Sequence, residues 1–288
     1  MKEQKMVLLY RWSKSLGVGF LGRFLIAVQI IVFIFLSDIL VVAEQFRMDN
    51  EITSGKFVVR SKTYFLDDDF LGVIEDNGEM TYYNAARDTF TLLAPSLRIQ
   101  TQLSASETRR VIDATLDGLR FSKTEIEPRY EFVANPVFKT ALDNKSGQLA
   151  LQSNWVDYKM TTEIFTDNNI AKRYFDFCNI TCYLNYRVTN SHRQLYRLEV
   201  NRVLRKENRF PQNITAIFYP NGKTGKTEET ISSSHKLIRR LTDEDKNKIN
   251  MVQNSINKFK TVKFNDYQEL IINQISPNKN TAPPAQKK

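Results

Sequence analysis

An almost uninterrupted apolar run near the N-terminus constrains this chain more than any other feature. From Phe24 to Leu36 the residues read FLIAVQIIVFIFL, in which Gln29 is the one polar side chain, and a second apolar stretch runs from Ile39 to Ala43. A water-soluble domain does not easily bury such a run, and basic residues precede it, which is typical of an export signal. We therefore expect residues 1–43 to carry the rest of the chain across the cytoplasmic membrane.

Two fates are open to this export segment. Val41 and Ala43 supply the small side chains that signal peptidase needs, which favours cleavage between Ala43 and Glu44. Alternatively residues 24–43 stay as an uncleaved signal anchor, since 20 residues cross a hydrocarbon core. Asp38 counts against the anchor, because a carboxylate deep in lipid costs roughly 2.5–3.5 kcal/mol. Cleavage predicts a periplasmic or secreted protein, and an anchor predicts a membrane-bound one.

The positive charge of the chain lies largely outside the expected domain. Of the net charge of +9, residues 1–43 carry +3 and the tail 274–288 carries another +3. Residues 44–273 therefore hold about +3, without the dense basic face that phosphate backbones require. We expect no nucleic-acid partner.

Residues 44–273 are expected to form a single domain that begins with strands. In 44–165 the larger side chains Leu97, Ile99 and Leu103 alternate with polar ones, which is the two-residue period of a half-buried strand. Turn sequences at 76–78 and 143–147 separate several such short runs. An antiparallel meander with one packed face is the expected result.

Helices are expected to cover this sheet. Ser104 or Ser106 is a candidate cap for a helix that ends near residue 119, with Val111 and Ile112 on its inner side. Residues 166–210 are predicted to be helical: one helix begins near residue 168, and a second covers 193–208 with its arginines facing solvent, namely Arg197, Arg202 and Arg205.

The C-terminal part predicts a β-hairpin and a helix over residues 211–273. The hairpin pairs 213–219 with 228–238, and the helix opens at Thr242-Asp243-Glu244-Asp245, a capping box with Asp in place of Glu. Residues 274–288 are polar and rich in proline, so they are expected to be a disordered tail.

Several segments together carry a resemblance to a known group of proteins. They are SGQLALQSNWVDYKMTTE (146–163), YNAARDTFTLL (83–93), SASETRRVIDATLDGL (104–119) and LTDEDKNKINMVQNSINKF (241–259). In order and character they resemble an uncharacterised family of exported proteins from planctomycete-type bacteria, over most of residues 44–265. Members are similar to periplasmic lipoprotein carriers of the LolA type. The resemblance implies an α+β fold with a curved, half-barrel-like antiparallel sheet covered by helices, and it transfers no site residues.

No motif in the chain predicts catalysis, a metal site or a cofactor. The G-x-S-x-G elbow of many hydrolases is absent, and two histidines, His192 and His235, are too few for a typical zinc site. Residues 67–69 are three aspartates, but they lack the Asp/Asn alternation and the Gly and Glu positions of a calcium-binding loop. We therefore interpret them as a charged turn. Cys178 and Cys182 lie on a predicted helix, where two buried thiols are favoured over a distorted disulfide.

The leading hypothesis is a non-enzymatic envelope protein that binds a lipid or acyl chain in a groove of its sheet. Its candidate groove residues are the large side chains on one face of the alternating strands: Phe90, Leu92, Leu97, Ile99, Tyr158 and Met160. For any single one of these residues, a core position is favoured over a groove position. The alternatives are an envelope structural or protein-interaction module, which binds an acidic partner through the 193–209 helix or a sheet edge, and thirdly a hydrolase without a recognisable motif.

Overall fold

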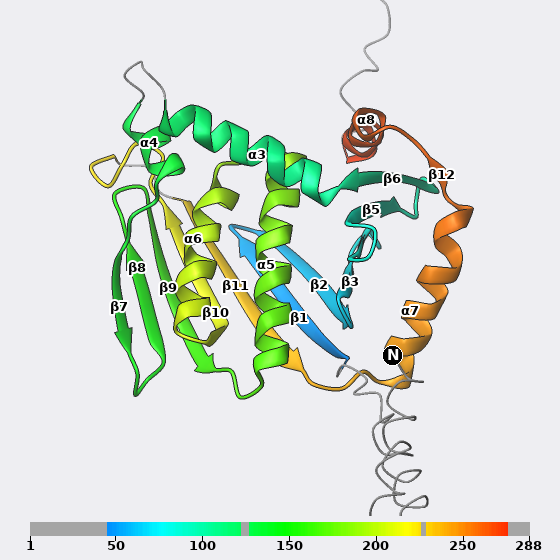
Figure 1. The fold of residues 1–288 in the computed structure, drawn as a ribbon, viewed down its shortest axis with the longest axis horizontal. Coiled ribbons are helices and arrows are strands. Elements are labelled where there is room, and N and C mark those ends of the chain that lie inside the picture. The colour runs from blue at the N-terminus through cyan, green and yellow to red at the C-terminus, as the bar shows by residue number, and fades with distance from the viewer. Residues whose placement is uncertain (1–44, 122–126, 226–228, 276–288) are drawn as a thin grey trace, which may run out of the picture. The chain divides into compact units, whose positions relative to one another are not determined.

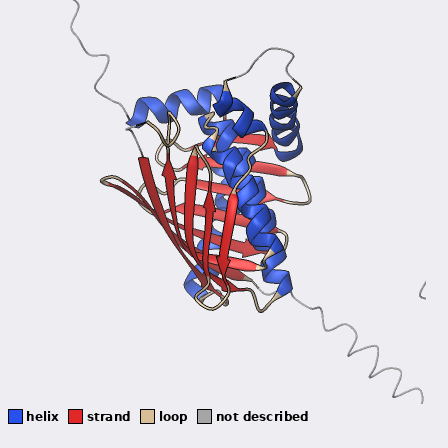
Figure 2. Ribbon diagram, turned by 90° about the vertical axis from the view of Figure 1, so that its left-hand side faces the viewer, coloured by secondary structure: helices blue, strands red, loops and turns tan. Residues whose placement is uncertain are grey.

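One continuous sheet organises the part of the chain that the structure describes. This computed structural model describes residues 45–121, 127–225 and 229–275. Within these ranges twelve strands pair in the order β12-β6-β5-β4-β3-β2-β1-β11-β10-β9-β8-β7, and all pairs are antiparallel except β12 with β6. The sheet stays open and bends, with most helices against one side (Figure 2). The α+β class and the curved antiparallel sheet are therefore confirmed.

The first half of the sheet is a simple meander, as the turn signals predicted. Its strands are β1 (Phe46–Ser54), β2 (Phe57–Leu66), β3 (Asp69–Ile74), β4 (Met80–Asn84), β5 (Thr89–Ala94) and β6 (Ile99–Ser104). Side chains alternate between two buried environments, because Phe65 packs with helix residues on one face and Tyr64 packs with a different helix on the other. We call the face that carries Phe65 the inner face and the face that carries Tyr64 the outer face.

The late hairpin lies at the centre of the sheet. It consists of β10 (Arg209–Phe218) and β11 (Glu229–Ile238), and β11 pairs with β1 while β10 pairs with β9. It thereby joins the meander to β9 (Val156–Ile164), β8 (Gln148–Gln152) and the edge strand β7 (Lys139–Asp143). The β7–β8 turn needs Gly147, since its φ is +70° and a Cβ there would lie 2.2 Å from the Thr162 carbonyl oxygen.

Four helices lie on the inner side of the sheet (Figure 1). They are α3 (Ala105–Arg120), α4 (Pro128–Ala134), α5 (Asn168–Thr189) and α6 (Arg193–Lys206). Ser104 caps α3 by accepting from the Glu107 amide, and Asp167 caps α5. The buried stripe of α3 is narrow and passes through Thr108, Ile112 and Leu116, so the prediction for Val111 is wrong: it is exposed.

The remaining helices, α7 (Asp243–Ser255) and α8 (Phe264–Ile275), lie towards the meander end. The predicted capping box of α7 is present, and Ile249 and Val252 pack on Tyr64 and Leu71 of the outer face. A short 3-10 turn, η1 (Ile256–Lys258), and β12 (Lys260–Thr261) lead to α8, which packs Tyr267 near β5 and β6. No helix in these described ranges is long and apolar enough to cross a membrane.

Some of the sequence predictions concern residues outside the described ranges. The export segment 1–43, the Ala43–Glu44 cleavage site and most of the predicted tail all lie there. The structure does describe residues 274 and 275, which form the end of α8.

Candidate functional site

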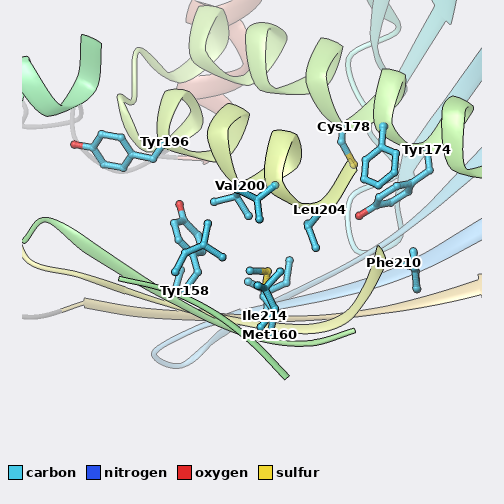
Figure 3. Packing of buried hydrophobic residues seen from close by; sticks show 14 of the residues in the cluster. Tyr158, Met160, Tyr174, Cys178, Tyr196, Val200, Leu204, Phe210 and Ile214 are labelled. Carbon is cyan, nitrogen blue, oxygen red and sulfur yellow. The ribbon is translucent and has the colours of Figure 1, made fainter. Parts of the chain in front are cut away.

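The six groove residues predicted from sequence belong to the packed interior, in two separate clusters. Tyr158 and Met160 of β9 pack under α6, and Figure 3 shows them pointing from the sheet towards Val200 and Leu204. The other four lie on or beside β5 and β6 at the far end of the sheet, where Phe90, Leu92 and Ile99 are buried and Leu97 is half-buried. The described residues form a separate hollow, and none of the six borders it.

That hollow lies beside α5, between this helix, α3 and the strands β2 to β4. Its volume is about 540 Å³, and it is partly open to solvent. Half of its lining residues are aromatic or apolar, namely Phe65, Phe70, Tyr83, Ala85, Phe177, Ile180, Tyr183 and Leu198. A space of this size is within the range of small-molecule sites, which are mostly apolar with a few polar groups.

Direct ring contacts hold the aromatic wall in place. Phe177 of α5 meets Phe70 edge-on with ring centroids 4.9 Å apart and Phe65 at 5.2 Å, while Phe70 stacks on Tyr83 at 5.2 Å. Such pairs contribute beyond their buried area and prefer fixed geometries. The wall is therefore largely preformed before any ligand arrives.

Charged side chains also line the hollow. Arg109, Lys172 and Arg173 line it together with Asp67, Asp68 and Asp176. Burial opposes ionisation of Asp176, but hydrogen bonds from Arg205 and Lys172 outweigh burial and lower its pKa. The guanidinium of Arg109 lies 5.8 Å from the centre of the Tyr183 ring. A lining that combines apolar and charged groups suits an amphiphile better than a fully polar ligand.

The aspartate triplet in this lining has a structural role, in agreement with its interpretation as a turn. Asp67 has φ +54°, which aspartate tolerates in a tight turn. Asp69 accepts hydrogen bonds from the Ala85 amide at 2.8 Å, the Tyr82 hydroxyl at 2.6 Å and the Asn84 side chain at 3.0 Å. Its carboxylate thus fixes the turn that places Ala85 on the wall of the hollow.

The other candidates from the sequence do not meet at one place. Cys178 and Cys182 are free, buried thiols on α5, and burial raises the pKa of Cys182 to about 12. His192 precedes α6, while His235 lies on β11, where its ring contacts Ser233 and Asn50. Among the described residues, no three His, Cys, Asp or Glu side chains are arranged so that they could hold a metal ion.

Of the three α6 arginines that were predicted to face solvent, Arg202 and Arg205 do so and Arg197 does not. Arg202 and Arg205 are exposed and pair with Glu199 and Asp176. Arg197 is half-buried, and it points towards the sheet rather than away from it.

Comparison with known proteins does not assign this site. No protein-family model matches the chain, and no curated protein matches its sequence. The shape and chemistry of the hollow are therefore the basis for a functional proposal.

Proposed function

We propose that the protein is an exported, non-enzymatic envelope protein that binds an apolar or amphiphilic molecule, such as an acyl chain, in the hollow beside α5. The observation that carries the proposal is the preformed aromatic wall around 540 Å³ of open space on the inner face of the sheet. Burying a chain against such a wall is favourable by about 25 cal/mol for each Å² of apolar surface removed from water. The apolar run before Ala43 supports the exported location.

A single substitution can fill the hollow without disturbing the core. Ala85 lines the hollow and is half-buried, so Ala85→Trp should place an indole in the ligand space. We expect at least tenfold weaker binding of N-phenyl-1-naphthylamine, a neutral fluorescent probe, because about 1.4 kcal/mol of lost contact already gives that factor. Fluorescence titration of the purified full chain measures it.

The neighbouring residue supplies a matched control. Ala86 is exposed and does not line the hollow, so Ala86→Trp adds the same side chain outside it. Its probe affinity should equal that of the unmodified protein. Equal affinities for all three proteins would refute the hollow as the binding site.

A second candidate, a protein-interaction module, has one observation in its favour. The edge strand β7 is largely exposed, and among the described residues no strand pairs with its edge that faces away from β8. Such an edge is a template for an added strand. The surface of α6 is a weaker candidate for binding an acidic partner, because Arg193, Arg202 and Arg205 already pair with carboxylates.

A further inference from the structure

Arg197 lies on the stripe of α6 that faces the sheet. Arg193, Arg197, Val200 and Leu204 follow steps of four, three and four, which place them on one side of a helix. Arg193 packs over the Phe218 ring at 4.6 Å, and Val200 and Leu204 are buried against the sheet (Figure 3). Arg197 therefore projects into the space between α6, α5 and the sheet, not into bulk solvent.

No negative charge balances Arg197 in the described part of the chain. The ionisable groups that interact with it electrostatically include Tyr174, Cys178, Cys182, Tyr158 and His235. Burial raises the pKa of the tyrosines and cysteines and lowers the pKa of His235, so all five are neutral at pH 7. Its guanidinium also makes no hydrogen bond or ion pair with another described residue.

Small residues lie on the sheet near Arg197. Arg193 contacts Phe218 of β10 and Glu229 of β11, which are paired with each other. Arg197 lies one helical turn, about 5.4 Å, further along α6, so it lies near the next inner-face pair, Ala216 and Ile231. Ala216 and the following inner residue of β11, Ser233, are small. The side chain of Arg197 is only half-buried, so solvent-accessible space reaches it.

An apolar strip on the inner face adjoins this position. Ile52 of β1 pairs with Ser233 of β11 on one side and with Val59 of β2 on the other, which places all three on the inner face. Ile52 and Val59 are each 41% exposed, and Phe57, two residues before Val59, is 79% exposed. The described helices leave this strip uncovered, while most large side chains of the inner face are buried.

We propose that Arg197 binds the oxyanion headgroup, carboxylate or phosphate, of an amphiphile whose chain lies along Ile231, Ile52, Val59 and Phe57. A planar guanidinium recognises such oxyanions with two parallel hydrogen bonds, and a neutral, partly desolvated setting strengthens them. The exposed strip supplies the apolar surface for the chain. This site is separate from the hollow beside α5, since Arg197 does not line that hollow.

The test compares headgroups on one chain. Oleate, oleoyl lysophosphatidate and neutral monoolein are titrated calorimetrically, below their critical micelle concentrations, into the delipidated full chain. At least one of the two anions should bind about 10- to 100-fold more tightly than monoolein, the range for a charged hydrogen-bonded pair. Whichever anion binds more tightly identifies the headgroup as carboxylate or phosphate.

Variants assign the preference to Arg197. Arg197→Gln should abolish the preference for the anionic lipids over monoolein. Arg197→Lys should retain part of this preference, because the positive charge stays but the two parallel N–H donors of the guanidinium are lost. Arg202→Gln, on the exposed side of the same helix, and Ala85→Trp should leave it unchanged. If Arg197→Gln does not fold, Arg197→Lys becomes the test. An anion preference in Arg197→Lys as strong as that of the unmodified protein would then count against the site.

Two outcomes overturn the inference. One is equal affinity of the unmodified protein for all three lipids, or no binding of any; the other is an anion preference that survives removal of the Arg197 guanidinium. Either leaves the hollow to be judged separately by the neutral probe and the Ala85→Trp variant.

Discussion

Replacement of Asp245 by alanine is expected to lower the free energy of unfolding by about 3 kcal/mol. Asp245 closes the capping box of α7 and also accepts two hydrogen bonds from Arg47 Nη1, at 2.6 and 2.8 Å. Its side chain is 6% exposed, so the pair is shielded from water. The variant loses a helix cap and leaves Arg47 with one carboxylate partner, Asp49. Urea-induced unfolding followed by circular dichroism measures the change.

Asp243 provides the control for this prediction. It lies in the same first turn of α7, but its side chain is 97% exposed and its partner Lys246 is 3.6 Å away. Asp243→Ala should change stability by no more than about 0.5 kcal/mol. Equal effects of the two substitutions would show that the Arg47 contact does not attach α7 to the sheet.

Acidification from pH 7 to pH 5 is expected to cost the protein about 2 kcal/mol of stability through His235 alone. Burial, assisted by Arg197, lowers the pKa of His235 from 6.5 to about 3. The neutral ring suits its contacts, since Nδ1 lies 2.8 Å from Asn50 Oδ1 and Nε2 lies 3.0 Å from Ser233 Oγ. Below pH 6.5 the unfolded chain binds a proton that the folded protein does not, so stability falls as pH decreases towards 3.

Parallel unfolding curves of the unmodified protein and His235→Gln at pH 7 and pH 5 isolate this contribution. The variant should lose about 2 kcal/mol less than the unmodified protein over this interval. His192→Gln serves as the comparison, because His192 is also half-buried but contacts aromatic rings near the start of α6. An identical pH response of the unmodified protein and His235→Gln would contradict the assignment.

The fold was predictable wherever a local signal decided the local structure. The turns at 76–78 and 143–147, the alternation of β6 and β9, and the capping box of α7 all depend on neighbours in sequence, and all are present. The short helix α4 and helix α8 were not predicted. The seven residues of α4 begin with Pro128 and are too few to show a clear 3.6-residue period, so packing decides their structure.

The site could not be predicted in the same way, because it depends on long-range contacts. The large side chains of β5, β6 and β9 look alike in sequence whether they line a groove or fill a core, and here they fill the core. The hollow instead combines Phe65, Ala85 and Phe177 from distant segments. The arginine spacing of α6 suggested solvent exposure, but the stripe through Val200 and Leu204 shows that Arg197 shares the buried side.

Mass spectrometry of an organic-solvent extract tests the proposed function most directly. The protein is purified without detergent from the envelope fraction of cells that express it, then extracted and compared with an Ala85→Trp preparation. The proposal predicts a lipid or fatty-acid species in near-equimolar amount in the unmodified protein and a reduced amount in the variant. An extract with no such species, together with a hollow that admits no neutral probe in solution, would contradict it.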